Sequence, residues 1–340
     1  MADQGKRDDT YVIVGAGVFG ASTALHLIRK YPSADVNLVD RSPFPSEVGA
    51  SWDWNKVIRA DYTSKLYMKL ALEAMELWRS DSLYRPFYHE SGLAWVDQSD
   101  LPRTIIDNYH DLNSTEKFRL VTPDEARRLW GGIHADADYH DVSEVFVNES
   151  SGWAEATKAL TKVIETAVAA GVKYVVAEVK EVLFDDLGST VGVRTQTHDV
   201  LSASHVILAT GAMTAKLLAD SAPHRKEIQV DGRVVAAAIC EGMATLSDAD
   251  AERFCQGPCF VSELDSAPGK CLSDTNTQSW AWVSSQLVKQ EVTYRQTRII
   301  NSRSTEMRAS PTRFITKRRA KTFRHPQRER TMASGTCLWG

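Results

Sequence analysis

The stretch Tyr11 to Gly20, YVIVGAGVFG, decides how the first part of this chain folds. YVIV is short, apolar and rich in β-branched residues, which is typical of a buried strand. Glycines follow at Gly15, Gly17 and Gly20, and the next segment, ASTALHLIRK, carries apolar residues at helical spacing. The stretch therefore predicts a strand, a tight glycine turn and a helix.

A second strand, DVNLVD, is predicted after Pro32 and ends at Asp40. In such a βαβ unit the glycines allow a tight turn and a close approach of the backbone to a pyrophosphate, and the helix N-terminus offers N–H groups to it. The acid can accept the ribose hydroxyls, and its charge disfavours a 2′-phosphate. The unit predicts a dinucleotide site, and by itself it leaves NAD and FAD both open.

Periodicity predicts three further helices. Residues 64–80, SKLYMKLALEAMELWRS, form an amphipathic pattern with one stripe that we expect to face the core. That stripe consists of Leu66, Leu70, Ala74 and Trp78, and Tyr67, Ala71 and Met75 lie beside it. TPDEARRLWGG, from Thr122, has a capping-box pattern and a Gly-Gly stop that predict a short helix. A longer helix is predicted over residues 153–170.

Strands are predicted within residues 172–184, 190–197 and 204–212, followed by a weaker one in WAWVSS at 280–285. A βαβ unit, a mixed middle, a helix and then strands favour an α/β nucleotide domain whose pieces are separated by an insertion. No apolar run is long enough to span a membrane, and the N-terminus lacks a secretory pattern. The sequence thus predicts a cytoplasmic enzyme without a membrane segment, and we expect a monomer.

The end of the chain differs from the rest. From Lys270 onward it holds 14 Lys and Arg against 4 Asp and Glu, although the whole chain has a net charge of -4. The basic run from Arg313 to Arg330 lacks aromatic platforms, so a disordered tail is the prediction and nucleic-acid binding is not expected. The five cysteines suggest neither a disulfide framework nor a zinc site. They are Cys240, Cys255, Cys259, Cys271 and Cys337.

Four segments, in order, resemble one family. GASWDWNKVIRADY at 49–62, SGWAEATKAL at 151–160, VAEVKEV at 176–182 and ILATGAMT at 207–214 are similar to motifs of the D-amino-acid-oxidase-like superfamily. The likeness is to its fungal branch of sarcosine, L-pipecolate and saccharopine oxidases and fructosyl amino acid oxidases. The resemblance implies FAD rather than NAD.

The resemblance also implies the architecture, a discontinuous Rossmann-like FAD-binding domain with an inserted mixed α+β substrate domain. We expect FAD-binding parts at 9–85 and 151–220, substrate-domain parts at 86–150 and 221–268, and an irregular tail at 269–340. The C-terminal part is expected to be incomplete, because the closing G-x-G-F-K-x-x-P stretch of the family is not found. A shift of reading frame or a mispredicted exon near codons 260–275 is one hypothesis for this change.

Site residues follow from the same resemblance. It places Asp40 and Arg41 at the ribose and adenine, and Val179 at the adenine through its backbone. It places Asn55, Lys56 and Val57 at the isoalloxazine. The remaining FAD-binding residues implied are Gly15, Ala16, Gly17, Val18, Phe19, Gly20, Ser51, Thr210 and Gly211.

The implied activity is oxidation of a secondary amine or N-substituted amino acid to an imine, with O2 reduced to H2O2. Lys56 is expected to stabilise charge on oxygen, and Arg59 to pair with a substrate carboxylate. The structural alternatives are a solvated Lys56 and an Arg59 ion pair with Asp61. Two alternative functions stay open, an inactive relative that acts as a nucleotide-binding module and an NAD-dependent dehydrogenase.

Two further patterns are expected to have no catalytic role. HADADYHD would align four potential metal ligands on a strand, but a polar loop gives the same letters, so no metal is expected. The four are His134, Asp136, Asp138 and His140. Cys337 is a weak candidate for covalent attachment of FAD, because nothing around it matches the motif of the family.

Overall fold

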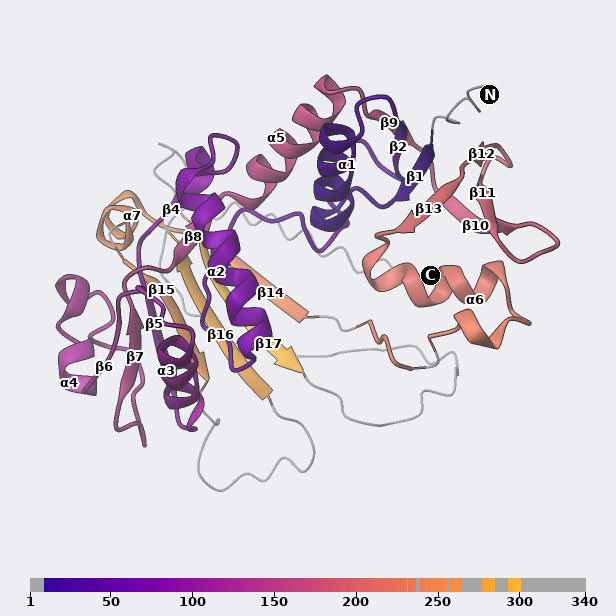
Figure 1. Cartoon of the computed structure of the whole chain (residues 1–340). Helices are drawn as coiled ribbons and strands as arrows, with labels where there is room; N and C mark the ends of the chain where they lie inside the picture. The colour runs from indigo at the N-terminus through magenta and orange to yellow at the C-terminus, as the bar shows by residue number, and fades with distance from the viewer. Residues whose placement is uncertain are drawn as a thin grey trace, which may run out of the picture. The chain divides into compact units, whose positions relative to one another are not determined.

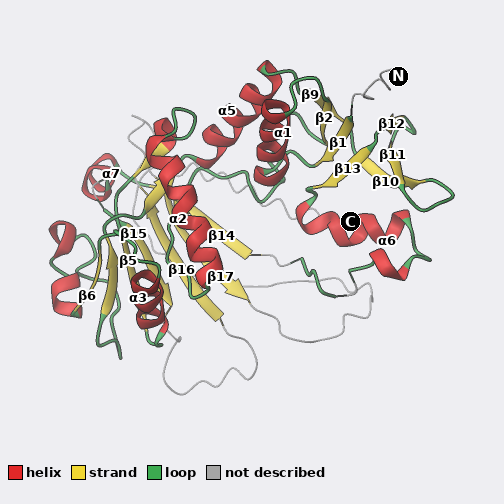
Figure 2. Ribbon diagram, viewed as in Figure 1, coloured by secondary structure: helices red, strands yellow, loops and turns green. Residues whose placement is uncertain are grey.

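The computed structural model describes residues 9–230, 232–236, 239–255 and 257–263, and the strands at 277–284 and 293–300 (Figures 1 and 2). Side chains are described for 9–230, 232–236, 246–255 and 257–262. The basic run at 313–330 and Cys337 lie outside the described residues, so the predictions for them stay predictions. No helix in the described part is long and apolar enough to cross a membrane.

The first sheet confirms the strand, turn and helix predicted from the glycine stretch. Its four strands lie in the order β13-β1-β2-β9, and all neighbouring strands are parallel. They are β1 (Thr10–Val14), β2 (Asp35–Asp40), β9 (Lys173–Val176) and β13 (His205–Leu208). Helix α1 (Val18–Lys30) connects β1 to β2. Because β9 and β13 come from far along the chain, this α/β unit is discontinuous in sequence, as predicted.

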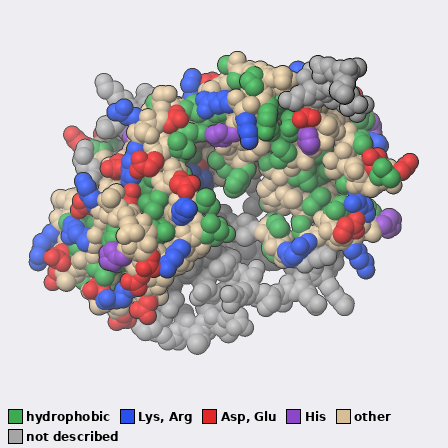
Figure 3. Space-filling model, in the orientation of Figure 1, with side chains coloured by type: hydrophobic (Ala, Val, Ile, Leu, Met, Phe, Trp, Pro, Cys, Tyr) green, Lys and Arg blue, Asp and Glu red, His purple; other side chains and the backbone are tan. Residues whose placement is uncertain are grey.

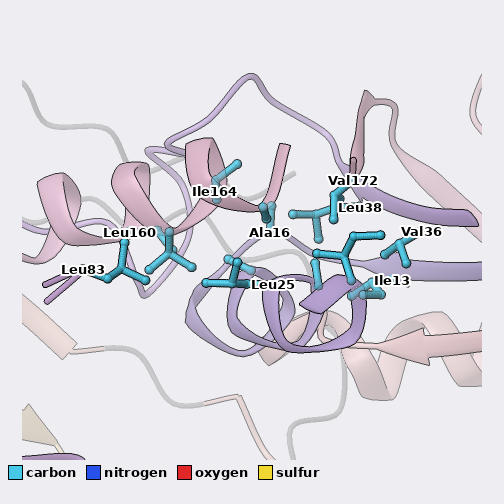
Figure 4. Packing of buried hydrophobic residues seen from close by; sticks show 14 residues of the cluster. Ile13, Ala16, Leu25, Val36, Leu38, Leu83, Leu160, Ile164 and Val172 are labelled. Atoms are coloured by element: carbon cyan, nitrogen blue, oxygen red, sulfur yellow. The ribbon is translucent and has the colours of Figure 1, made fainter. Parts of the chain in front are cut away.

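The core of this unit lies between the sheet, α1 and helix α5 (Ala156–Ala169). Figure 4 shows Leu160 of α5 beside Leu25 of α1, and Ile164 of α5 belongs to the same buried cluster. Strand residues, among them Ile13 and Leu38, complete the cluster and are fully buried. Burying such aliphatic side chains contributes about 1.5–3 kcal/mol each to stability. The periodicity seen in the sequence therefore reports a real packing face.

Helix α5 begins three residues later than predicted. Residues Gly152–Ala154 form strand β8, which pairs with β3 (Lys56–Ile58) and β4 (Tyr88–His89) in a three-stranded antiparallel sheet. Trp153 is buried in a second core cluster with Met68 and Met75. The prediction of helix from residue 153 is wrong because cross-strand pairing and burial override local helix propensity.

Helix α2 (Lys65–Ser80) begins one residue after the predicted start and ends where predicted, and its N-cap Ser64 accepts the Tyr67 N–H at 3.5 Å. The predicted core-facing stripe is wrong, although Met75, which was predicted beside it, is buried. Met68 and Met75 are the buried residues, whereas Leu66 is 64% exposed and Leu70 is 53% exposed. A helix that carries apolar residues on several faces allows more than one burial direction, and the flexible methionines fill the irregular core.

The remaining strands form three sheets. Their orders are β15-β5-β7-β6, β10-β11-β12 and β14-β17-β16. The strands are β5 (Leu93–Asp97), β6 (Phe118–Val121), β7 (Val145–Asn148), β10 (Val179–Phe184), β11 (Thr190–Thr195), β12 (Val200–Ser202), β14 (Ile239–Thr245), β15 (Cys259–Glu263), β16 (Thr277–Ser284) and β17 (Thr293–Ile300). The strand expected in WAWVSS is therefore confirmed as β16.

The other helices are α3 (Leu101–Asp111), α4 (Pro123–Ala126), α6 (Thr214–Ser221) and α7 (Asp248–Phe254). The capping box that predicted α4 is present: Thr122 Oγ1 accepts the Glu125 N–H at 3.2 Å, and Glu125 Oε2 accepts the Thr122 N–H at 2.8 Å. Figure 3 shows acidic and basic side chains interspersed over the visible face of the described part. That face therefore presents no extended surface of a single charge sign.

Candidate functional site

The backbone geometry of the turn requires glycine at two positions. Gly15 has φ +100°, and a Cβ there would lie 2.4 Å from the carbonyl oxygen of Ala209. A Cβ on Gly20 would lie 1.8 Å from the carbonyl oxygen of Gly15. Both contacts are with backbone atoms, which cannot rotate away as a side chain can. The two glycines thus allow β1, α1 and the end of β13 to meet closely.

The N-terminus of α1 is open to an anion. Its N-cap, Gly17, has no side chain, and the first turn contains no acidic residue. The Val18 N–H donates to Ser51 Oγ at 2.9 Å, but the Phe19 and Gly20 N–H groups have no acceptor among the described residues. Unpaired N–H groups and the positive end of the helix dipole favour a phosphate here.

Asp40, at the end of β2, ties the glycine turn to the sheet. Its Oδ2 accepts the Ala16 N–H at 2.9 Å, and its Oδ1 accepts the Ser42 N–H at 3.2 Å. Each carboxylate oxygen has a further lone pair, so these bonds leave acceptor capacity for a ribose hydroxyl. Arg41 beside it is exposed. The ribose and adenine roles of both residues stay predictions.

The segment after β13 closes the other side of the turn. The Ala209 N–H donates to the Val14 carbonyl at 2.8 Å, which places Thr210 and Gly211 next to the glycine turn. Gly211 adopts φ +53°, and no atom lies within 4 Å of the Cβ it lacks. Val179, the first residue of β10, packs against the cluster that contains Val14. Elements from four distant parts of the chain therefore converge at the carboxyl ends of β1 and β2, where α/β sheets bind ligands.

Lys56 is held by an ion pair. Its Nζ lies 2.8 Å from Oδ2 of Asp53, and their side chains are 44% and 8% exposed, respectively. Asp53 is anchored in turn, because its N–H donates to Thr157 Oγ1 at 3.0 Å and its carbonyl accepts the Thr157 N–H at 3.0 Å. Lys56 is therefore a partly exposed cation held by an ion pair, and its role at the isoalloxazine stays a prediction. Asn55 next to it is buried.

The Val57 side chain faces the hydrophobic core. It packs against the cluster of Met68, Met75 and Trp153. A cofactor contact at Val57 would therefore use its backbone, whereas Lys56 offers its side chain. The resemblance could not make this distinction, because it names positions and not directions.

Arg59 lies between two aromatic rings. Its guanidinium carbon is 4.6 Å from the ring centre of Tyr62 and 4.7 Å from that of Trp95. Nη1 donates to the backbone carbonyl of Asp61. The alternative of a side-chain ion pair with Asp61 is wrong in form, because the Asp61 carboxylate accepts bonds from other residues. The planar faces of the guanidinium are covered, so a carboxylate would approach its N–H edge.

The Asp61 carboxylate is 1% exposed and accepts three hydrogen bonds. Its Oδ1 accepts from the Tyr109 hydroxyl at 2.8 Å and from Asn148 Nδ2 at 2.8 Å, and its Oδ2 accepts from Ser151 Oγ at 3.1 Å. Burial raises the pKa of Asp61, and the positive charge of Arg59 and the three donors oppose that rise. The network is thus well satisfied despite its burial.

Sequence reasoning missed several residues of this segment. The pair of Asp53 and Lys56 is close in sequence, but residues 53–56 are not helical, so the helical i,i+3 rule could not have found it. Nothing local indicates Thr157, Trp95 or Tyr109, because each approaches from another part of the chain. These partners become visible only when the strands are assembled.

HADADYHD forms turns and no strand, so its four potential ligands do not line one face of a strand. In the described part no group of three His, Cys, Asp or Glu residues is placed to hold a metal ion. His140 Nδ1 pairs with Asp138 at 2.8 Å. His134 is buried and stacked on Phe260, with ring centres 4.2 Å apart, and burial lowers its pKa to about 4. His134 is thus a neutral core residue at physiological pH.

The family profile described as "DAO: FAD dependent oxidoreductase" matches residues 10–258 of this chain. The chain belongs to this FAD-dependent oxidoreductase family. The match spans the glycine turn, the Lys56 to Asp61 segment and the closing strand. It therefore includes every described residue that the sequence assigned to the cofactor.

Curated relatives are similar to this chain over about half of their length. An L-saccharopine oxidase of Schizosaccharomyces pombe is 31% identical over 219 residues, which are 60% of this chain and 51% of the relative. The amino acid oxidase fsqB of Aspergillus fumigatus is 28% identical over 247 residues, which are 62% of this chain and 50% of the relative.

Solved structures share the fold. The fructosyl peptide oxidase from E. terrenum superposes with a TM-score of 0.65 at 20% identity, and the match covers 88% of this chain and 64% of the other. Amadoriase I from Aspergillus fumigatus gives a TM-score of 0.61 at 19% identity, over 86% of this chain and 63% of the other. At this identity the likeness concerns the fold.

FAD is the cofactor of this family, and the residues present fit it. The free N–H groups at α1, the glycine turn and the acceptor capacity of Asp40 are what a pyrophosphate and a ribose require. The alternative of an NAD-dependent dehydrogenase is not favoured, because the matching family uses FAD.

Proposed function

We propose that this chain is an FAD-dependent oxidase of a secondary amine or N-substituted amino acid. The observation that carries the proposal is the glycine turn at Gly15, closed by Asp40, Ser51 and Ala209 within a chain of the FAD-dependent family. The relatives support the substrate class, since they are a saccharopine oxidase and an amino acid oxidase. The inactive relative then becomes an outcome of the experiment below.

The residues proposed to hold FAD fall into three groups. The pyrophosphate would bind the backbone from Gly15 to Gly20 and the neighbourhood of Ser51. Asp40 and Arg41 would face the ribose and adenine, with Val179 near the adenine. The isoalloxazine would lie near Asn55, Lys56 and the backbone of Val57, and Thr210 and Gly211 would border the cofactor.

When bound, FAD would accept a hydride from the carbon beside the amine nitrogen and pass two electrons to O2, which gives H2O2. Hydrolysis of the resulting imine would release the products. Lys56 would supply a fixed positive charge to the oxygen as it is reduced. Its pair with Asp53 holds the ammonium in place before reaction, which reduces the cost of reorganisation.

Arg59 is proposed to bind a carboxylate of the substrate. The aromatic rings of Tyr62 and Trp95 hold the plane of the guanidinium, and one of its N–H groups donates to the Asp61 carbonyl. The other N–H groups have no acceptor among the described residues. A guanidinium edge of this kind can pair with a carboxylate through two parallel hydrogen bonds.

The first experiment is an absorbance spectrum of the purified protein between about 350 and 500 nm, before and after acid precipitation. A flavin band that moves to the supernatant supports bound, non-covalent FAD. L-Pipecolate and saccharopine are then tested for peroxide release. A band that stays in the pellet indicates covalent attachment. No band even with excess FAD contradicts the proposal and favours the inactive relative.

Lys56→Met tests the role of the cation, with Lys216→Met as the matched control. Lys216 also forms an ion pair, with Asp220 at 2.6 Å, but on the exposed side of α6. We expect Lys56→Met to slow reoxidation of the reduced flavin by about tenfold or more and Lys216→Met to leave it unchanged. Equal reoxidation rates in both variants would remove Lys56 from the mechanism.

A further inference from the structure

The Asp61 carboxylate joins side chains from three separate parts of the chain. Tyr109 comes from α3, Asn148 from the end of β7, and Ser151 from the residues just before β8. Asn148 Nδ2 also donates to the Tyr109 hydroxyl at 3.2 Å. The side chains are buried, so water does not compete for these bonds. We call these four residues the Asp61 network.

The Asp61 network is connected to the Arg59 guanidinium through the backbone of Asp61. Arg59 Nη1 donates to the carbonyl of Asp61, the same residue whose carboxylate is fixed by three donors. Tyr62, the next residue, provides one ring of the cage around Arg59, and Trp95 of β5 provides the other. Fixing Asp61 therefore fixes both the acceptor of Arg59 and the position of the Tyr62 ring.

We propose that Asp61 is a positioning residue that holds the Arg59 guanidinium between Tyr62 and Trp95, with its N–H edge directed at a substrate carboxylate. Only the part of the inference that concerns a substrate carboxylate rests on the proposed function. The positioning itself concerns residues of this chain and can be measured without cofactor or substrate. Asp61 acts through Arg59 and has no direct contact with the substrate.

Hydrogen bonds rather than charge carry this role. An asparagine at position 61 could still accept from Tyr109 and Asn148 through its oxygen and donate to Ser151 through its amide. Asp61→Asn should therefore preserve the position of Arg59. Asp61→Ala removes the three hydrogen bonds of the carboxylate but keeps the backbone carbonyl that accepts from Arg59, and Tyr109→Phe removes only the hydroxyl that bridges Asp61 and Asn148. Tyr109→Phe also leaves the ring and the charge unchanged, so it is the milder test if Asp61→Ala fails to fold.

The readout is the fluorine NMR signal of Trp95 in protein labelled with 5-fluorotryptophan. Trp95→Phe assigns the signal, and Arg59→Ala shows where it lies without the cation. We expect Tyr109→Phe to displace the signal towards its position in Arg59→Ala, and Asp61→Asn to leave it near the wild-type position. Tyr139→Phe is the control, because the Tyr139 hydroxyl also makes a buried bond, to the His134 carbonyl at 3.2 Å.

A Trp95 signal that moves in Arg59→Ala but stays in place in Tyr109→Phe overturns the proposal. A signal that moves equally in Tyr139→Phe also overturns it, because the effect is then general loosening. Titration with L-pipecolate tests the proposed function separately. If the ligand leaves the wild-type signal unmoved, Arg59 does not bind the carboxylate, and the comparison of variants still decides the positioning role. If it binds, Tyr109→Phe should raise its Kd by about tenfold.

Discussion

Gly20→Ala is the sharpest test of the close approach at the glycine turn. The new Cβ would lie 1.8 Å from the Gly15 carbonyl oxygen, whereas close C···O contacts are ordinarily about 3.3 Å. The helix or the turn must therefore move by roughly 1.5 Å, although both are packed in the core of the first sheet. Overpacking typically costs about 1–3 kcal/mol, and a contact this short with backbone atoms belongs at the upper end of that range.

The assay is urea unfolding followed by tryptophan fluorescence, together with titration of FAD. We expect Gly20→Ala to lower the urea midpoint by roughly 1 M, and to weaken FAD binding by about tenfold or more because the N–H groups at α1 are displaced. Gly49→Ala is the matched control. Its Cβ would meet nothing closer than the Ser46 carbonyl oxygen at 3.5 Å. If both variants unfold at the same urea concentration and bind FAD equally, the approach of Gly20 to the Gly15 carbonyl is not as close as described.

Glu116→Gln should lower the free energy of unfolding in urea by about 2 kcal/mol, because the buried Glu116 side chain accepts two hydrogen bonds from Arg79 at 2.8 and 2.9 Å. A decrease in the unfolding free energy of less than about 0.5 kcal/mol would contradict this. Burial lowers the pKa of His134 from 6.5 to about 4, so the unfolded chain takes up a proton first and stability falls as the pH drops from about 6.5 to about 4. His134→Gln should reduce that fall in urea unfolding free energy by up to about 3 kcal/mol, and an unchanged pH profile would refute the assignment. Burial raises the pKa of Cys259 to about 12, so iodoacetamide at about pH 8 should alkylate the half-buried Cys255 before Cys259. Peptide mass spectrometry can follow the order of labelling, and early labelling of Cys259 would argue against its burial.

Local features of the sequence were enough to predict the first βαβ unit. Only glycine suits the φ of +100° at Gly15, and only glycine avoids the contact at Gly20, so their spacing carried reliable information. The same holds for the capping box of Thr122 and Glu125, whose partners are three residues apart. These signals are readable because each interaction is closed within one turn or one helix.

The direction in which α2 buries its side chains was decided by the tertiary structure. The sequence contains apolar residues on several faces of that helix, and Met68 and Met75 are buried only because the neighbouring sheet is on their side. Likewise, Trp153 lies in a strand because β3 and β4 pair with its segment. Local propensity cannot report a partner that is distant in sequence.

The surroundings of Arg59 show the same division between sequence and tertiary structure. The resemblance singled out Arg59, but the ring of Trp95 and the donors Tyr109 and Asn148 come from 36 to 89 residues further along the chain. The sequence by itself determined the glycine turn and the residue types of the site. Only the tertiary structure decided which way the guanidinium points and what fixes it, because that geometry arises from contacts that form when separate strands and helices pack together.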